Sequence, residues 1–235
     1  MAAAPTYVGA GNVATGTGAI TPTYPAGLQN GDILILQLCT ADDGGVDVGG
    51  ATFGGTLIGE ARSGGGGSTD CRCTAYWALS DGTESGGSCS VPDNGSGNSA
   101  RITAWRGCDT VNPIEADVGI QSTPTLNTSV QWDTITTTVD NVMVLLMHSA
   151  GDNNTTSTPS AGNLEARTEL YDHVFTTHDD YNMQLSHAIM LSAGATGTPS
   201  ATQVGSEQDA QLTIGLMPLI AGGAADEPII IMSGF

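Results

Sequence analysis

The sequence contains no lysine and only five arginines, against 24 acidic residues, so its 235 residues carry a formal net charge of −19. A surface of this charge repels nucleic acid and anionic membranes. We therefore expect neither as a partner. The same charge favours solubility, or work at high salt where the self-repulsion is screened.

Other absences narrow the fold class. The sequence has no helical heptads and no apolar run long enough for a membrane span, which excludes a coiled coil and a membrane helix. Residues 1–5 lack a basic segment followed by an apolar core, so no signal peptide is expected. The five cysteines are an odd number, which favours reduced thiols and assembly in a cytoplasm. Cys71 and Cys73 are predicted to be small core residues.

What the sequence has in abundance is turn-forming residues. Its 33 glycines and many Thr, Ser, Asn and Asp residues predict short strands joined by tight turns. The most apolar of these segments is residues 31–38, Gly-Asp-Ile-Leu-Ile-Leu-Gln-Leu. Its length, its branched side chains and the preceding Asn30-Gly31 turn signal predict a buried strand.

This apolar segment returns as residues 140–147, about 110 residues later along the chain. At similar spacings, residues 74–80 match 186–192, and 100–104 match 210–214. The matches extend to the face pattern, because the alternating set Cys73, Ala75, Trp77 and Leu79 corresponds to Leu185, His187, Ile189 and Leu191. We interpret this as a tandem duplication of one strand set.

The duplication predicts an all-β, jelly-roll-like β-sandwich over residues 19–220, with halves of about 19–110 and 129–220. Its inner faces are expected to be apolar and its outer faces to carry Thr, Asp and Ser. Residues 1–18 are expected to form a flexible arm or a weak edge strand. Residues 109–128 are expected to cross between the halves.

The last segment, residues 221–235, is a glycine-rich spacer followed by an apolar end. We predict that this tail either folds back as an edge strand or docks on a neighbouring subunit by adding a strand. The residues expected to make that contact are Ile229, Ile230, Ile231, Met232 and Phe235.

The search for catalytic patterns finds none. There is no Gly-x-Ser-x-Gly elbow, no phosphate loop with its lysine and no His-Glu-x-x-His. His173 and His178 beside three aspartates favour a solvated hairpin tip over a metal site, and residues 42–47 do not have the spacing of an EF-hand loop. His187 is predicted to be a hydrogen-bonded core histidine. Aromatics at 5% are scarce for sugar platforms. We expect no enzyme activity, no cofactor and no metal.

Three segments resemble a family of virion-associated proteins of tailed bacteriophages. Residues 20–36 resemble that family's opening, 101–114 its strand and crossing segment, and 193–197 its last turn. The resemblance covers residues 18–218 and rests on strand and turn signatures. It implies a β-sandwich structural protein of the particle and carries over no functional residue. The absence of lysine and the apolar end depart from the pattern and leave the attachment surface open.

The resulting hypothesis is a capsid decoration (cement) protein of the virion, assembled in the host cytoplasm. Its expected partners are the major capsid protein and copies of itself in a homo-oligomer. Two alternatives remain. One is a tail-tip or fibre module that contacts the host surface, and the other is a carbohydrate-binding domain.

Overall fold

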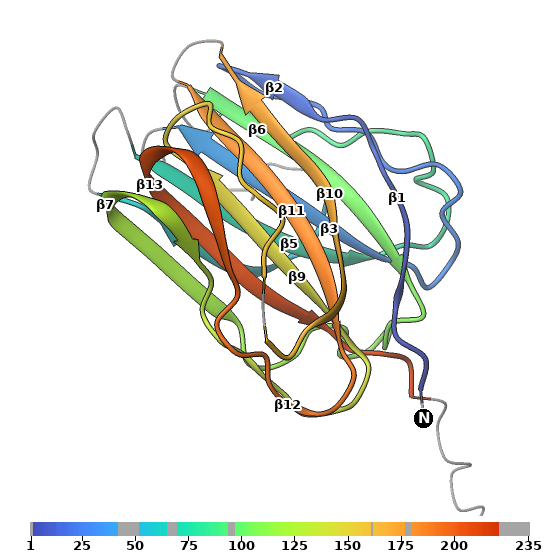
Figure 1. The fold of residues 1–235 in the computed structure, drawn as a ribbon. Coiled ribbons are helices and arrows are strands. Elements are labelled where there is room, and N and C mark those ends of the chain that lie inside the picture. The colour runs from blue at the N-terminus through green and yellow to red at the C-terminus, as the bar shows by residue number, and fades with distance from the viewer. Residues whose placement is uncertain are drawn as a thin grey trace, which may run out of the picture.

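The computed structural model of the chain describes residues 2–41, 52–64, 70–93, 97–160, 162–176 and 180–220. These residues form an all-β protein of two packed antiparallel sheets (Figure 1). Its strands are β1 Thr6–Ala10, β2 Ala14–Gly16, β3 Ile33–Ala41, β4 Thr56–Arg62, β5 Cys71–Leu79, β6 Gly97–Arg106, β7 Gly119–Gln131, β8 Thr136–Thr137, β9 Val142–Ala150, β10 Glu165–Phe175, β11 Tyr181–Met190, β12 Gly194–Ala195 and β13 Ser200–Leu216. Within these residues, no helix has the length and apolar character that a membrane span requires.

Each half of the chain builds one sheet. The first sheet has the order β1-β6-β3-β5-β4, with β2 also paired to β6, and the second has the order β7-β13-β9-β11-β10. The two orders are the same when the strands are taken as equivalent pairs: β3 with β9, β4 with β10, β5 with β11 and β6 with β13. This repeated topology supports the predicted duplication.

The β-sandwich prediction is confirmed, but its jelly-roll detail is wrong. In a jelly roll the chain passes back and forth between the two sheets, whereas here each half stays within its own sheet. The physical reason lies in the pairing of neighbouring strands: β3, β5 and β6 find hydrogen-bond partners within their own half. These strands need the other half of the chain only to cover their inner apolar faces.

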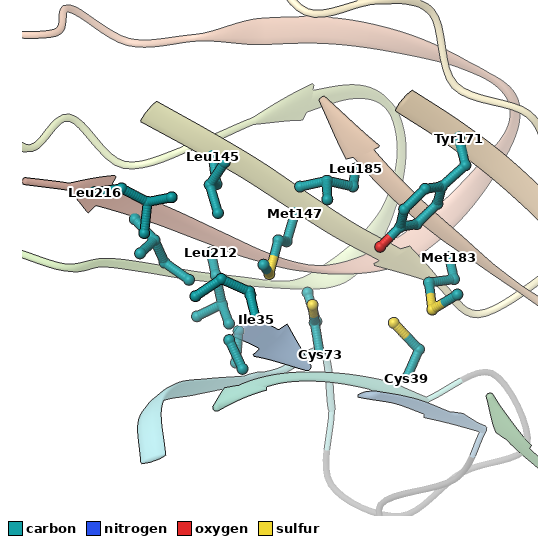
Figure 2. Close-up of a cluster of buried hydrophobic side chains, with 14 of the residues drawn as sticks. Ile35, Cys39, Cys73, Leu145, Met147, Tyr171, Met183, Leu185, Leu212 and Leu216 are labelled. Atoms are coloured by element: carbon teal, nitrogen blue, oxygen red, sulfur yellow. The ribbon is translucent and has the colours of Figure 1, made fainter. Parts of the chain in front are cut away.

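The shared core lies between the sheets and draws on both halves. Figure 2 shows Ile35 and Cys73 of the first sheet pointing toward Leu145, Met147 and Leu212 of the second. Cys71 is also buried here, so both close cysteines are core residues as predicted. All five cysteines are buried and free. Because each inner face is covered by the other sheet, neither half has a complete core of its own.

The outer faces are also covered, which the sequence analysis did not anticipate. Every residue of β3 and β9 is buried, as befits strands with apolar layers on both faces. Over the first sheet, loop residues including Ile20, Tyr24 and Phe53 pack on Leu34, Leu36 and Leu38. Over the second, Trp132 and Leu164 pack on Val144 and Leu146. The outer face of the first sheet is therefore mainly apolar, and of the predicted Thr, Asp and Ser residues its central strands carry Thr40 and Thr74 there, both buried.

The register of the repeat differs by one residue from the sequence match. The match aligned Ile33 with Val142, but Ile33 faces the shared core whereas Val142 faces outward. The residue that corresponds to Ile33 is Met143, which also faces the shared core. The turn before each strand agrees, because Gly31 and Asn141 both have positive φ, at 93° and 62°. Glycine and asparagine are the residues that adopt this conformation most readily.

The edge strands were the elements that the sequence pattern predicted least well. Residues 6–10 and 14–16 form β1 and β2 on β6, so the flexible-arm reading of residues 1–18 is wrong for them and the edge-strand reading holds. Likewise β7 begins at Gly119, inside the predicted crossing segment, so the second repeat starts earlier than residue 129. An edge strand is held by backbone hydrogen bonds on one side and needs few apolar side chains.

Candidate interaction surfaces

The predicted contact residues Ile229–Met232 and Phe235 lie outside the described residues. The structure does fix the point from which their segment leaves, which is Ile220. Whatever its conformation, the chain from there to Ile229 can span at most about 30 Å. Figure 1 places the N-terminus beside the end of the described chain, so both ends of the fold meet at one place.

We call this place the terminal surface and define it as residues 2–6, 106–107, 139–140 and 218–220. Backbone hydrogen bonds hold it together: Leu219 N donates to Gly107 O at 2.7 Å, and Asp109 N donates to Met217 O at 2.9 Å. The Asn141 side chain donates to Ala2 O at 2.9 Å and so ties down the first residues. The terminal surface is therefore a built part of the fold.

Two shallow depressions lie in the terminal surface. One, of about 170 Å³, is lined by Ala2, Val139, Asp140, Pro218 and Ile220. The other, of about 310 Å³, is lined by Ala3, Ala4, Thr6, Arg106, Gly107 and Leu219. Ile220 lines the first and Leu219 the second, and these side chains are 53% and 54% exposed. Exposed aliphatic side chains beside small apolar residues are typical of a protein contact surface.

A second distinctive region is the outer face of the second sheet. On the first sheet, Leu38 of β3 lies between Thr74 and Ala100 in the strand register. At the equivalent position of the second sheet, His148 of β9 lies between Gln184 and Gln211. All six residues are buried. The second half has thus placed large polar side chains where the first half has small or apolar ones.

His148 belongs to a buried hydroxyl–imidazole–carboxylate arrangement. Its Nε2 lies 3.1 Å from Asp209 Oδ1, and its Nδ1 lies 3.3 Å from Thr156 Oγ1. These are the partners of a catalytic triad. However, His148 and Asp209 are 0% exposed and Thr156 is 4% exposed, so no substrate reaches the hydroxyl. Here the arrangement fixes the Thr156 loop to the sheet.

The loop from residue 152 to 160 is fastened by further buried polar groups. Asn182 Nδ2 donates to Asn154 O at 2.7 Å, while its Oδ1 accepts from Ala150 N at 2.8 Å. Asp172 Oδ2 accepts from Thr156 N at 2.7 Å, and burial raises the pKa of this carboxyl. The loop is held in one position over the second sheet by side chains that rise from β10 and β11.

Polar contacts also join the two sheets through the core. Gln37 of β3 accepts a hydrogen bond from Tyr171 Oη at 2.9 Å and donates to Gln184 O at 3.1 Å. Burial raises the pKa of Tyr171 well above its usual range. The Arg101 guanidinium lies over the Tyr171 ring at 4.6 Å and 2.7 Å from His173 Nε2. Burial and this guanidinium lower the pKa of His173.

The predictions for the histidines have mixed outcomes. His187 faces the shared core as predicted, with its ring 5.5 Å from Trp105 and its Nδ1 3.3 Å from Met143 Sδ. His173 is partly buried against Tyr171 and Arg101, so it is not the solvated tip residue that was expected. His178 and residues 42–47 lie outside the described residues. Among those that the structure does describe, no cluster of three or more metal-ligating side chains occurs.

Comparison with known proteins gives no relative. No protein-family model, curated protein or solved structure matches the chain.

Sequence reasoning missed the polar outer face of the second sheet. The signal was present, because the even-numbered side of β9 and β11 ends in His148 and in Asn182, Gln184 and Ser186. The sequence pattern predicts only that Thr, Asp and Ser lie on the outer faces, and it does not predict that larger polar side chains are buried there. Their burial follows from the loop of residues 152–160, whose position the sequence pattern does not reveal.

Proposed function

We propose that this chain is a non-enzymatic structural protein of a tailed-bacteriophage particle, and specifically a capsid decoration protein that binds the major capsid protein on the capsid exterior. The observation that carries the proposal is the terminal surface. There, exposed Leu219 and Ile220 each line one of two depressions, at the point where the segment with Ile229–Met232 and Phe235 leaves the fold. The resemblance of residues 18–218 to virion proteins supplies the identity of the partner.

In this proposal the sandwich is a rigid body whose attachment elements are gathered at one end. The terminal surface covers the capsid protein or a second copy of the chain, and the apolar tail adds a strand to the same partner. Each contact is small, but many copies reinforce the shell through multivalency. The −19 charge keeps unbound copies soluble and apart from nucleic acid.

The test is the copy number of this chain in purified particles, measured by quantitative mass spectrometry against the major capsid protein. Hundreds of copies per particle are expected of a decoration protein. A handful would contradict decoration and favour the tail-tip or fibre module. Absence from particles would overturn the virion assignment.

Attachment is then tested with surface variants. Leu219→Ser and Ile220→Ser are each expected to weaken particle binding roughly ten-fold, which is what the loss of one buried aliphatic contact is worth. Deletion from Ile229 onward is expected to weaken it further. Leu126→Ser is the matched control, because Leu126 is 61% exposed but lies on β7, away from the terminal surface. Equal binding by all variants would contradict attachment through this surface.

A further inference from the structure

Two depressions lie in the outer face of the second sheet and its covering loops, away from the terminal surface. A depression of about 430 Å³ is lined by Asp117, Gln121, Gln131, Asp133, Thr134 and Thr198, together with Val118, Gly119 and the buried Trp132. A second, of about 320 Å³, is lined by Ser129, Ser157, Thr158, Ser160, Ser200 and Thr202, with Ala201. Both include Gln131 in their lining. They therefore adjoin at Gln131, and we call the two depressions together the polar groove.

The lining of the polar groove consists of hydroxyl, amide and carboxylate groups. Three hydroxyl pairs line it, each at 3.3 Å: Thr134 with Thr198, Ser157 with Thr202, and Ser160 with Ser200. Each hydroxyl in such a pair keeps hydrogen-bonding capacity for a ligand, because it has one donor and two acceptor positions. Of the two larger apolar lining residues, Trp132 is 1% exposed and Val118 is partly buried, so an apolar ligand finds little surface.

Buried polar side chains also lie on the sheet beside the groove, out of direct reach of a ligand. Gln211 lies opposite Gln121 in the register of β13 and β7, and paired residues share one face of a sheet. Gln211 is 0% exposed, and neither its amide nitrogen nor its amide oxygen has a hydrogen-bond partner among the described residues. The Gln203 oxygen is likewise unpaired there. These groups make the region behind the groove polar, but they do not themselves contact a ligand.

The groove is rigid because the loop that forms part of its lining is hydrogen-bonded to the sheet. Ser157, Thr158 and Ser160 belong to the loop that His148, Asp172 and Asn182 fasten to the sheet. Two further bridges, Thr156 with Gln203 and Ser160 with Ser200, join this loop to the start of β13. Hydroxyl groups that are held in place before binding lose little conformational freedom when a ligand arrives.

We propose that the polar groove binds a neutral or amino-bearing oligosaccharide. Sugar hydroxyls are both donors and acceptors and so match the lining. Anionic ligands are excluded because Asp117 and Asp133 line the groove and none of the described lining residues is basic. Without an exposed aromatic platform the affinity is weak, with a Kd of about 1 mM. The site is independent of attachment through the terminal surface, and either can fail alone.

The first half supplies an internal control for this inference. Its equivalent residues Leu38, Thr74 and Ala100 lie under an apolar cover of loop residues that include Ile20 and Tyr24. At this position the large polar groups belong only to the half that carries the groove, although the outer face of the first sheet also buries Thr74 here and Thr40 and Asn98 farther along.

The test is an NMR titration of the ¹⁵N-labelled full chain with maltohexaose, chitohexaose and, as the anionic probe, hexagalacturonate. At least one of the two neutral hexamers is expected to cause saturable shifts at Gln131, Ser157 and Thr202, whereas hexagalacturonate causes none. Gln131→Trp fills the groove and is expected to weaken binding at least ten-fold, and Thr134→Val several-fold. Gln29→Trp, an exposed glutamine in the first half, is the matched control and should bind as the parent does.

Three results would overturn the proposal. The first is the absence of saturable shifts with both neutral hexamers up to about 10 mM, ten times the expected Kd. The second is binding that Gln131→Trp and Thr134→Val both leave unchanged while their spectra show the folded protein. The third is equal binding of hexagalacturonate, since the acidic lining should repel it.

Discussion

The two halves of the chain share a strand order but differ in what covers them. The first sheet lies under an apolar layer, in which Leu38 packs with Tyr24 and Phe53 in one cluster. The second lies partly under a polar layer, in which His148 holds Asp209 and Thr156. The inner faces are both apolar because each buries the other. The comparison teaches that the shared core fixes the inner faces of a duplicated sandwich, while the outer faces are free to diverge.

The largest expected effect on stability comes from giving each outer face the residue of the other at the equivalent positions 38 and 148. Leu38→His places an imidazole in an apolar layer without partners and should lower the free energy of unfolding by about 3–5 kcal/mol. The reciprocal His148→Leu leaves Asp209 and Thr156 without their buried imidazole partner and should lower the free energy of unfolding by about 2–3 kcal/mol. Urea denaturation measures both. Leu38→Met is the control and should cost less than about 1.5 kcal/mol. A tolerated Leu38→His would mean that the two covers are interchangeable.

The turns that lead into the central strands differ in the same way. In the first half, buried Asp32 accepts two hydrogen bonds from Arg106, at 2.7 and 2.8 Å, and one from Gln29 N at 2.8 Å. In the second, Asp140 accepts one hydrogen bond from the described residues, from Ala193 N at 2.8 Å. Asp32→Asn should therefore cost about 2 kcal/mol and Asp140→Asn about 0.5–1 kcal/mol. Equal costs in urea denaturation would contradict the assigned asymmetry.

The halves should also differ in their response to acid, because all four histidines lie in the second half. Burial lowers the pKa of His187, and burial with the nearby Arg101 lowers that of His173. The unfolded chain therefore binds protons at a higher pH than the folded one, so stability is complete above the ordinary histidine pKa of about 6.5 and falls as the pH drops below it.

The measurement is the thermal midpoint between pH 7.5 and 5.5, a window above the titration of most carboxyl groups. A decrease of roughly 2–4 °C is expected. His173→Gln with His187→Gln should remove most of it. A double variant that keeps the full decrease would show that other groups are responsible.

The sequence was most informative where burial is greatest. The apolar runs of β3 and β9 predicted the two central strands, and the alternation of residues 71–79 predicted β5 with its inner face. It was least informative at the sheet edges, because β1, β2 and β7 are held by backbone pairing and carry few apolar residues. The register of the repeat was missed by one residue, since Ile33 and Val142 look alike but face opposite ways.

The candidate sites were less predictable than the fold. The apolar character of residues 229–235 could be read directly, but the terminal surface from which they leave depends on the meeting of residues 2–6 with 218–220. The polar groove was not foreseen. It combines β7, the 152–160 loop and the start of β13, which are far apart in the chain, and its hydroxyl residues resemble ordinary turn residues in the sequence.

The central claim is that the two halves form one sandwich around one shared core, with their differences confined to the outside. Native-state hydrogen exchange of the full chain tests this most directly, by comparing the slowest amides of β3 with those of β9. Because both strands depend on the same core, we expect their exchange to require the same free energy, equal to that of global unfolding. If the amides of one strand opened at a free energy several kcal/mol below the other's, the halves would be separate folding units and the claim would be wrong.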